Sequence, residues 1–248
     1  MSDAMARSRM SVQRSRPDPA RGVFETLLVR DGRALELEAH VARLGSSVEK
    51  LYGASPPEVR DLVADAARGV ELGRLRLAVA PNGNGEPHAE IRVAPVGESL
   101  VFPPFARAVR LSRLDVHGGL GAHKWADRTL LEEAETGDSV ALIVDGDGSV
   151  LEASRANVFV VEDGAIVTPP ADGRILPGVT RARLLEIVPV REQPISFARL
   201  LAADEVFLSG SVRGVEPVWG IEGGRAWHVG TVTPLVADEL RRRWEMHP

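Results

Sequence analysis

The chain has 248 residues, enough for one large domain or two small ones. Its formal net charge of −5 disfavours nucleic-acid binding, and it has no cysteine, which excludes disulfides, thiolate nucleophiles and cysteine-ligated metals. No apolar run is long enough to span a bilayer, and residues 1–20 lack the apolar core of a secretory signal, so we expect a cytoplasmic protein with a disordered N-terminal extension over 1–20.

The N-terminal half alternates between strand and helix patterns. The predicted elements are, in order, a strand over 22–29, helices over 41–51 and 57–68, and strands over 74–80, 89–96 and 107–114. Asp31-Gly32 is a strong hairpin signal after the first strand, and Gly53 is placed to end the first helix. The segment 116–122 is rich in glycine and poor in core residues, so we place the boundary between two lobes there.

The C-terminal half has more closely spaced strands. We expect a helix over 125–135, strands over 139–145, 157–163 and 165–170, a helix over 179–187, strands over 204–210 and 213–221, and a final helix over 232–244. These patterns predict two α+β or α/β lobes, 21–115 and 123–248, with antiparallel-rich sheets and helices on the outside.

Lys124 is one of only two lysines in a chain whose other cations are mostly arginines. It follows the glycine-rich segment and precedes the predicted helix over 125–135. A lysine differs from an arginine because its amine loses a proton readily when it is buried, and it then serves as a base or forms a Schiff base. Lys124 is either a surface charge or the reactive centre.

Four further features carry suitable chemistry, although each also has a purely structural interpretation. Glu152 follows apolar strand residues, and Pro177-Gly178 opens a helix whose free N–H groups at Val179 and Thr180 suit an anion such as phosphate. The remaining candidates are the hydroxyl of Ser211 and the cation of Arg43. Together with Lys124 they form the set that pyridoxal phosphate requires: an amine, an acid for the ring nitrogen and a phosphate cup.

Other familiar motifs fail on spacing. The run that starts at Asp145 resembles a calcium loop, but Val150 and Ala156 stand where that loop requires glycine and glutamate. The segments around Ser211 and Gly119 lack the register of a nucleophile elbow and the context of a dinucleotide loop. The histidines are scattered without metal-ligand spacing, so we expect no metal site.

Five ordered segments resemble the class IV aminotransferase family, the fold-type IV pyridoxal-phosphate enzymes. They are "GVFETL…DGRALELEAHVARL", "HKWADR", "VLEASRANVFVVEDGAIVTPP", "ILPGVTRARLLEI" and "VFLSGSVRGVEPV", and they cover roughly residues 22–218. The family includes branched-chain and D-amino-acid aminotransferases and aminodeoxychorismate lyases. The resemblance implies a two-lobed D-amino-acid-aminotransferase-like fold, pyridoxal 5′-phosphate as cofactor, and a homodimer.

The resemblance also implies a role for each matching residue. Lys124 would form the Schiff base and, once displaced by the substrate amine, act as the catalytic base. Glu152 would face the pyridine nitrogen and keep it protonated. The phosphate would be held by Arg43, Val179, Thr180 and Ser211.

Departures from the family patterns bear on the reaction. Branched-chain aminotransferases carry an asparagine–tyrosine pair after the lysine, whereas this chain has Arg128 four residues on, as lyases do. Pro81 stands where stand-alone lyases usually have an arginine for a substrate carboxylate, so Arg128 or Arg213 would take that part. Phe24 and Thr26 would line the substrate side, with Thr26 among the catalytic residues.

The resemblance therefore leads us to expect a lyase that converts 4-amino-4-deoxychorismate to 4-aminobenzoate and pyruvate. The alternative is an aminotransferase acting between a small amino acid or amine and a 2-oxo acid, which would share every cofactor contact. A third hypothesis, a non-catalytic binding domain, is disfavoured because Lys124, Glu152 and the segment 177–180 are all intact.

Overall fold

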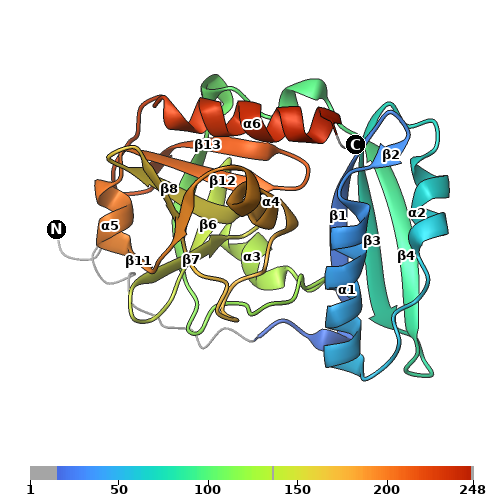
Figure 1. Cartoon of the computed structure of the whole chain (residues 1–248). Coiled ribbons are helices and arrows are strands. Elements are labelled where there is room, and N and C mark those ends of the chain that lie inside the picture. The colour runs from blue at the N-terminus through green and yellow to red at the C-terminus, as the bar shows by residue number, and fades with distance from the viewer. Residues whose placement is uncertain (1–15, 136, 247–248) are drawn as a thin grey trace.

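The computed structural model describes residues 16–135 and 137–246, so positions 1–15 of the predicted disordered extension lie outside the described residues. Figure 1 shows a smaller N-terminal lobe beside a larger C-terminal lobe. No helix in the described part of the chain is long and apolar enough to cross a membrane. The mixed α+β class and the two-lobed architecture predicted from the sequence are confirmed.

The N-terminal lobe is a four-stranded antiparallel sheet in the order β2-β1-β3-β4, with two helices. Its elements are η1 (Pro19–Arg21), β1 (Val23–Arg30), β2 (Arg33–Ala34), α1 (Leu37–Tyr52), α2 (Arg60–Ala67), β3 (Leu72–Pro81) and β4 (Pro87–Pro95). Alternate residues of β1 and β3, such as Leu27 and Leu77, pack against α1 and α2 in one core. The intervening residues, such as Phe24, Thr26 and Arg76, lie on the opposite face of the sheet and line a cavity between the lobes.

The C-terminal lobe is built on a nine-stranded sheet in the order β10-β9-β8-β12-β13-β5-β6-β7-β11. The elements are η2 (Glu98–Leu100), η3 (Phe105–Arg107), β5 (Val109–Asp115), α3 (Thr129–Ala134), β6 (Ser139–Val144), β7 (Ser149–Ala153), β8 (Asn157–Glu162), β9 (Ala165–Thr168), α4 (Val179–Ile187), β10 (Val190–Glu192), β11 (Ile195–Ser196), α5 (Phe197–Ala202), β12 (Glu205–Gly210), β13 (Gly214–Ile221) and α6 (Val232–Met246).

The large sheet is strongly curled around its core. Val167 of β9 and Ile195 of β11, near opposite ends of the strand order, belong to the same buried cluster. A second cluster forms between the sheet and the helices α4 and α6, and the stacked rings of Phe159 and Phe207 lie within it. Leu28 of β1 joins this second cluster, so apolar packing connects the two lobes.

The predicted lobe boundary at 116–122 is wrong by one strand. β5 pairs in parallel with both β6 and β13, and Leu111 is fully buried in the core of the large sheet. The change of lobe therefore occurs between β4 and β5. The pattern of a single strand gives no information about its pairing partner, which explains the error.

The predicted disorder over 16–20 is also wrong. The Asp18 backbone N–H donates a hydrogen bond to Asp127 at 3.0 Å, and the Tyr52 hydroxyl donates one to the Pro19 carbonyl at 2.9 Å. Arg21 forms an ion pair with Asp127 at 2.8 Å. These contacts hold the segment against both lobes.

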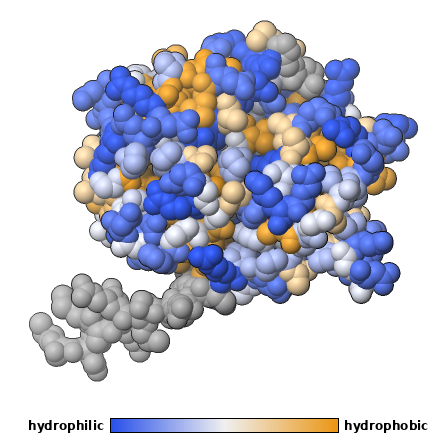
Figure 2. Space-filling model, turned by 60° about the horizontal axis from the view of Figure 1, so that its bottom comes forward, coloured by the Kyte–Doolittle hydropathy of each residue, from blue (hydrophilic) through white to orange (hydrophobic). Residues whose placement is uncertain are grey.

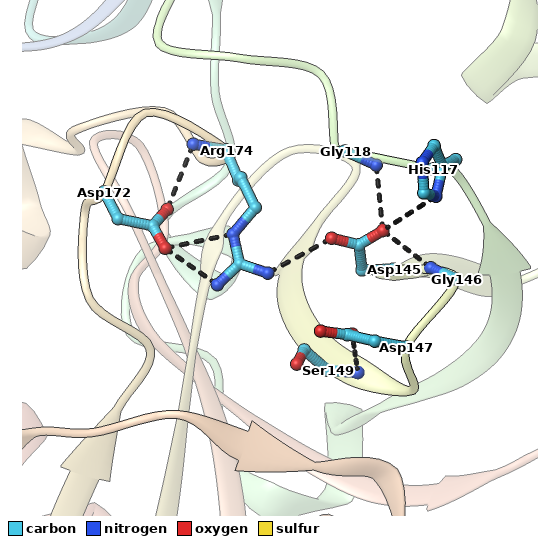
Figure 3. A network of polar contacts seen from close by, with 8 residues as sticks. All are labelled: His117, Gly118, Asp145, Gly146, Asp147, Ser149, Asp172 and Arg174. Atoms are coloured by element: carbon cyan, nitrogen blue, oxygen red, sulfur yellow. Dashed lines mark hydrogen bonds and ion pairs between the residues drawn. The ribbon is translucent and has the colours of Figure 1, made fainter.

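The glycine-rich segment 116–122 lies within the C-terminal lobe and is tied to it by the polar network in Figure 3. The Asp145 carboxylate accepts hydrogen bonds from the backbone N–H of Gly118 at 2.8 Å and from the Arg174 guanidinium at 3.1 Å. The Gly121 N–H donates to the Arg174 carbonyl at 3.2 Å. Gly119 passes this carbonyl so closely that a Cβ would lie 2.2 Å from its oxygen.

Candidate active site

A cavity of about 350 Å³ lies between the two lobes, a size that suits a small-molecule ligand. All of the site residues predicted from the sequence line this cavity: Phe24, Thr26, Arg43, Lys124, Arg128, Glu152, Val179, Thr180, Ser211 and Arg213. The fold thus brings together residues that are far apart in the sequence, while their roles stay predictions. No cluster of three or more potential metal ligands occurs among the described residues.

Lys124 is held in place by strand-like pairing with β1. The Phe24 N–H donates to the Lys124 carbonyl at 2.9 Å, and the Ala126 N–H donates to the Gly22 carbonyl at 2.9 Å. The predicted helix over 125–135 therefore begins only at Thr129, because its first residues pair with β1 instead. This pairing sets the Lys124 amine 4.9 Å from the centre of the Phe24 ring.

The surroundings of Lys124 favour its neutral amine. Burial lowers the pKa of this amine to about 8, and the nearby cation of Arg43 acts in the same direction. Glu25 and Glu152 act in the opposite direction but do not outweigh these effects. An amine with this pKa is available as a nucleophile and as a base near neutral pH.

Glu152 lies inside β7 rather than after a strand, and it is almost fully buried. Among the described residues its carboxylate accepts one hydrogen bond, from the Leu176 N–H to Oε2 at 3.1 Å. Burial raises the pKa of Glu152 to about 8, although the hydrogen bond from Leu176 and the cation of Lys124 oppose the shift. A buried carboxyl group of this kind suits a proton shared with a ring nitrogen.

The N-terminus of α4 and β12 together form a cup for an anion. Gly178 provides no side-chain cap, so the first N–H groups of α4 are free to bind a ligand. The hydroxyl oxygens of Thr180 and Ser211 lie 3.5 Å apart at this end of the cavity. Ser209 Oγ, which also lines the cavity, is buried without a hydrogen-bond partner among the described residues. An anionic ligand would satisfy all these donors.

Arg43 reaches the same region from α1 in the other lobe. Its Nε donates to Glu25 Oε1 at 2.8 Å and its NH2 donates to Glu25 Oε2 at 2.5 Å. Its NH1 donates to the carbonyl of Pro177, just before α4, at 2.9 Å. Arg43 therefore places a cation beside the helix N-terminus and connects the two lobes.

A group of arginines forms another part of the cavity wall: Arg74, Arg76, Arg128, Arg155 and Arg213. Arg155 and Arg213 both form ion pairs with the buried Glu216, at 2.8 Å and 3.0 Å. Arg128 donates to the Ser154 carbonyl at 3.1 Å, so it is held next to the end of β7, the strand that carries Glu152. These positions agree with a wall that binds anionic groups of a ligand.

Arg76 is not among the residues that the sequence motifs single out. Its guanidinium carbon lies 3.7 Å from the centre of the Phe24 ring, and no described residue forms a hydrogen bond or ion pair with it. It stands directly opposite Arg92 of β4, and like charges in opposite positions destabilise a sheet. The alternation in "RLRL" places Arg74 and Arg76 on the same face of a strand. This alternation is the one sequence feature that could have pointed to Arg76.

Burial lowers the pKa of Arg76, and the cations of Arg128 and Arg74 lower it further. The positive charge of Arg76 is therefore unfavourable in the ligand-free protein, and an anion bound in the cavity would stabilise it.

Known proteins resemble this chain in both sequence and fold. The family model for amino-transferase class IV matches residues 22–221. A putative branched-chain-amino-acid aminotransferase of Methanocaldococcus jannaschii is 26% identical over 255 residues, covering 90% of this chain and 88% of that protein.

Among the solved structures that resemble this chain, two match it over more than nine-tenths of its length. A hypothetical aminotransferase from Mycobacterium tuberculosis, in its PLP-bound form, has a TM-score of 0.79 and 26% identity, covering 92% of this chain and 90% of that one. The 4-amino-4-deoxychorismate lyase from Pseudomonas aeruginosa has a TM-score of 0.75 and 28% identity, covering 95% of each chain.

The residues of the cavity fit pyridoxal 5′-phosphate. Lys124 would supply the amine, Glu152 would supply the acid for the ring nitrogen, and the free donors at the start of α4 suit the phosphate. The Ser209 hydroxyl, which has no partner among the described residues, and the Arg43 cation lie in the same cavity. Because the family model spans all of these residues, the chain belongs to the class IV aminotransferase family of pyridoxal-phosphate enzymes.

Proposed function

We propose that this enzyme is a 4-amino-4-deoxychorismate lyase that releases pyruvate and 4-aminobenzoate. The observation that carries the proposal is Arg128. It follows Lys124 by four residues, as in lyases, and it lines the cavity beside Glu152. The similarity to the Pseudomonas aeruginosa lyase over nearly the whole chain supports the same assignment.

The arginine wall matches the charge of this substrate. 4-Amino-4-deoxychorismate has two carboxylates, one on the ring and one on the enolpyruvyl group. Arg128 and Arg76 are candidates to bind them, because neither forms an ion pair among the described residues, whereas Arg155 and Arg213 share Glu216. Arg213 is therefore a weaker candidate than Arg128 for binding a substrate carboxylate. Bidentate binding by an arginine would also orient the substrate ring.

Pyridoxal phosphate, when bound, withdraws electrons from the carbon that bears the substrate amine. Lys124, freed as a neutral amine, accepts the proton from this ring carbon. The electron pair forms a ring double bond while the C–O bond to the enolpyruvyl group breaks, which leaves an aromatic ring. The leaving oxygen takes up the proton that Lys124 removed, with the Thr26 hydroxyl as a candidate relay, and the enol becomes pyruvate. Glu152 keeps a proton at the cofactor's ring nitrogen throughout.

The reaction is tested by supplying purified enzyme and cofactor with 4-amino-4-deoxychorismate and no amino acceptor. We expect pyruvate and 4-aminobenzoate to appear in equal amounts. Replacement of Arg128 by methionine should lower kcat/KM about tenfold to a hundredfold, since it removes a charge-assisted hydrogen bond. A strict requirement for a 2-oxo acid would contradict the lyase assignment.

The second candidate is an aminotransferase that acts between a small amino acid or amine and a 2-oxo acid. The similarity to the Methanocaldococcus jannaschii and Mycobacterium tuberculosis proteins, both described as aminotransferases, favours it. The same cofactor residues serve both reactions, and Arg76 would then bind the second carboxylate of a dicarboxylic partner. Transfer of an amino group to 2-oxoglutarate, measured as glutamate formed, separates this activity from the lyase.

A further inference from the structure

The phosphate end of the cavity rests on a buried network that none of the assigned roles explains. Glu25 of β1 is 1% exposed, and its two carboxylate oxygens both contact Arg43. His40, one helical turn before Arg43 on α1, is 1% exposed, and its Nδ1 lies 2.7 Å from Glu25 Oε2. The two α1 side chains therefore converge on one carboxylate.

The Glu25 carboxylate is ionised in this network. Burial alone would raise its pKa, but the cation of Arg43 and the hydrogen bonds from His40 and Arg43 outweigh burial and lower the pKa to about 2. Burial lowers the pKa of His40, so the ring is neutral and donates through Nδ1–H. Its Nε2 is buried and has no partner among the described residues.

Stability alone is a poor explanation for this arrangement. Buried ion pairs contribute little net stability compared with apolar packing, and a buried ring nitrogen without a partner adds a further cost. What the network achieves is a fixed direction for Arg43. A guanidinium has five N–H groups, and Glu25 and Pro177 use three of those on Arg43. One N–H on each terminal nitrogen is left for a ligand in the cavity that Arg43 lines.

We propose that Glu25 and His40 are positioning residues, which hold Arg43 so that its free N–H groups bind the phosphate of the cofactor beside the N-terminus of α4. Glu25 fixes the rotation of the guanidinium, and His40 fixes the second oxygen of Glu25. The hydrogen bond from Arg43 to the Pro177 carbonyl also connects the N-terminal lobe to the segment that precedes α4. These contacts lie at the phosphate end of the cavity, so they serve either of the two reactions proposed above.

The test compares equilibrium binding of pyridoxal phosphate with binding of pyridoxal, which lacks the phosphate, in spectrophotometric titrations without substrate. For Glu25→Gln, we expect the preference for pyridoxal phosphate over pyridoxal to fall about tenfold to a hundredfold, the effect of losing one well-aligned charged hydrogen bond. The dissociation constant for pyridoxal should not rise, because Lys124 and Glu152 are intact and the loss of the Glu25 charge lowers the pKa of the Lys124 amine for both ligands alike. Inorganic phosphate should also compete less well against pyridoxal phosphate in this variant.

Two replacements of His40 show whether its hydrogen bond to Glu25 or only its packing matters. His40→Asn keeps an N–H donor close to the place of Nδ1, and it should retain most of the preference for pyridoxal phosphate. His40→Ala removes the donor and should lose that preference as Glu25→Gln does.

The control variant is Glu205→Gln. Glu205 is also buried, and it accepts the backbone N–H groups of Val232 and Thr233 at the start of α6, away from the cavity. It should lower the unfolding temperature but leave the ligand preference unchanged. If Glu25→Gln weakens both ligands equally, or if it only lowers the unfolding temperature as Glu205→Gln does, the network is structural and the proposal is wrong. Failure of the lyase assay would not affect this outcome.

Discussion

At the scale of single residues, the surroundings of Lys124 favour a reactive amine. The amine lies near Phe24 and shares the cavity with the cations of Arg43 and Arg128, and burial together with these cations lowers its pKa to about 8 from the ordinary 10.5. A lowered lysine pKa means that the neutral, reactive amine is present at a lower pH.

Lys124 in the ligand-free protein should therefore react with an amine reagent with a midpoint near pH 8. The variant Lys50→Arg makes the measurement clean, because it leaves Lys124 as the only lysine. Modification at Lys124 is followed by mass spectrometry of the peptide across a pH series from neutral to strongly alkaline. A midpoint close to 10.5 would show that burial does not perturb the amine.

The electrostatic cost of Arg76 predicts a role in binding substrate anions. Arg76→Met should raise KM for the carboxylate substrate and lower kcat/KM about tenfold to a hundredfold, while cofactor binding stays unchanged. Arg92→Met is the matched control, because Arg92 stands directly opposite on β4, pairs with Glu90 at 3.3 Å and does not line the cavity. Equal kinetic effects from both variants would count against this role.

The residues of the site differ in how far the sequence could reveal them. Lys124, Glu152 and Thr180 have the residue types that the cofactor requires, and they lie in motifs that resemble those of the family. Arg76 and Glu25 lie within ordinary strand patterns, and their importance depends on partners across the sheet and from α1. A sequence pattern shows which face of a strand a residue occupies, but it does not show what covers that face.

At the scale of elements, local signals predicted most strands and helices well. α4 spans Val179–Ile187, as its Pro-Gly start indicates, and Gly53 ends α1 with a φ of 62°. The predictions failed where tertiary pairing decides the structure. β5 joins the large sheet, and the residues after Lys124 pair with β1 although their pattern is helical.

The glycine-rich segment before Lys124 packs tightly against the Arg174 carbonyl at one of its two adjacent glycines, which makes the packing testable by substitution. Gly118 and Gly119 both have positive φ, 73° and 68°, but only Gly119 faces the Arg174 carbonyl. Gly118→Ala should destabilise the protein by about 1 kcal/mol, the cost of the left-handed conformation. Gly119→Ala should cost about 3 kcal/mol or more, because the added methyl group also displaces backbone.

Denaturant unfolding of the two variants measures both costs. A methyl group at Gly118 would have no heavy atom of another segment within 4 Å, so Gly118→Ala isolates the conformational contribution. Equal destabilisation by the two variants would mean that the approach of Arg174 to Gly119 is not tight.

At the scale of the whole molecule, the cavity exists only because two lobes meet. The N-terminal lobe supplies Phe24, Thr26 and Arg43, while the C-terminal lobe supplies Glu152 and Thr180. Figure 2 shows a mostly hydrophilic face with apolar patches between the polar residues. The expectation of a cytoplasmic enzyme stays a prediction.

We propose that the enzyme is a homodimer, as its family resemblance implies. Sedimentation equilibrium should give twice the chain mass of 26.7 kDa. Large exposed apolar side chains in the C-terminal lobe, among them Trp219 and Leu235, are candidates for the interface. A mass of one chain at micromolar concentration would contradict the proposal.

We infer that pyridoxal phosphate binds covalently to Lys124 in the cavity between the lobes. Borohydride reduction of the protein with its cofactor, followed by peptide mass spectrometry, tests for this bond. We predict a single reduced cofactor adduct on the peptide that contains Lys124, present in Lys50→Arg and absent in Lys124→Ala. An adduct on Lys50 alone, or the same adduct in Lys124→Ala, would contradict the assignment.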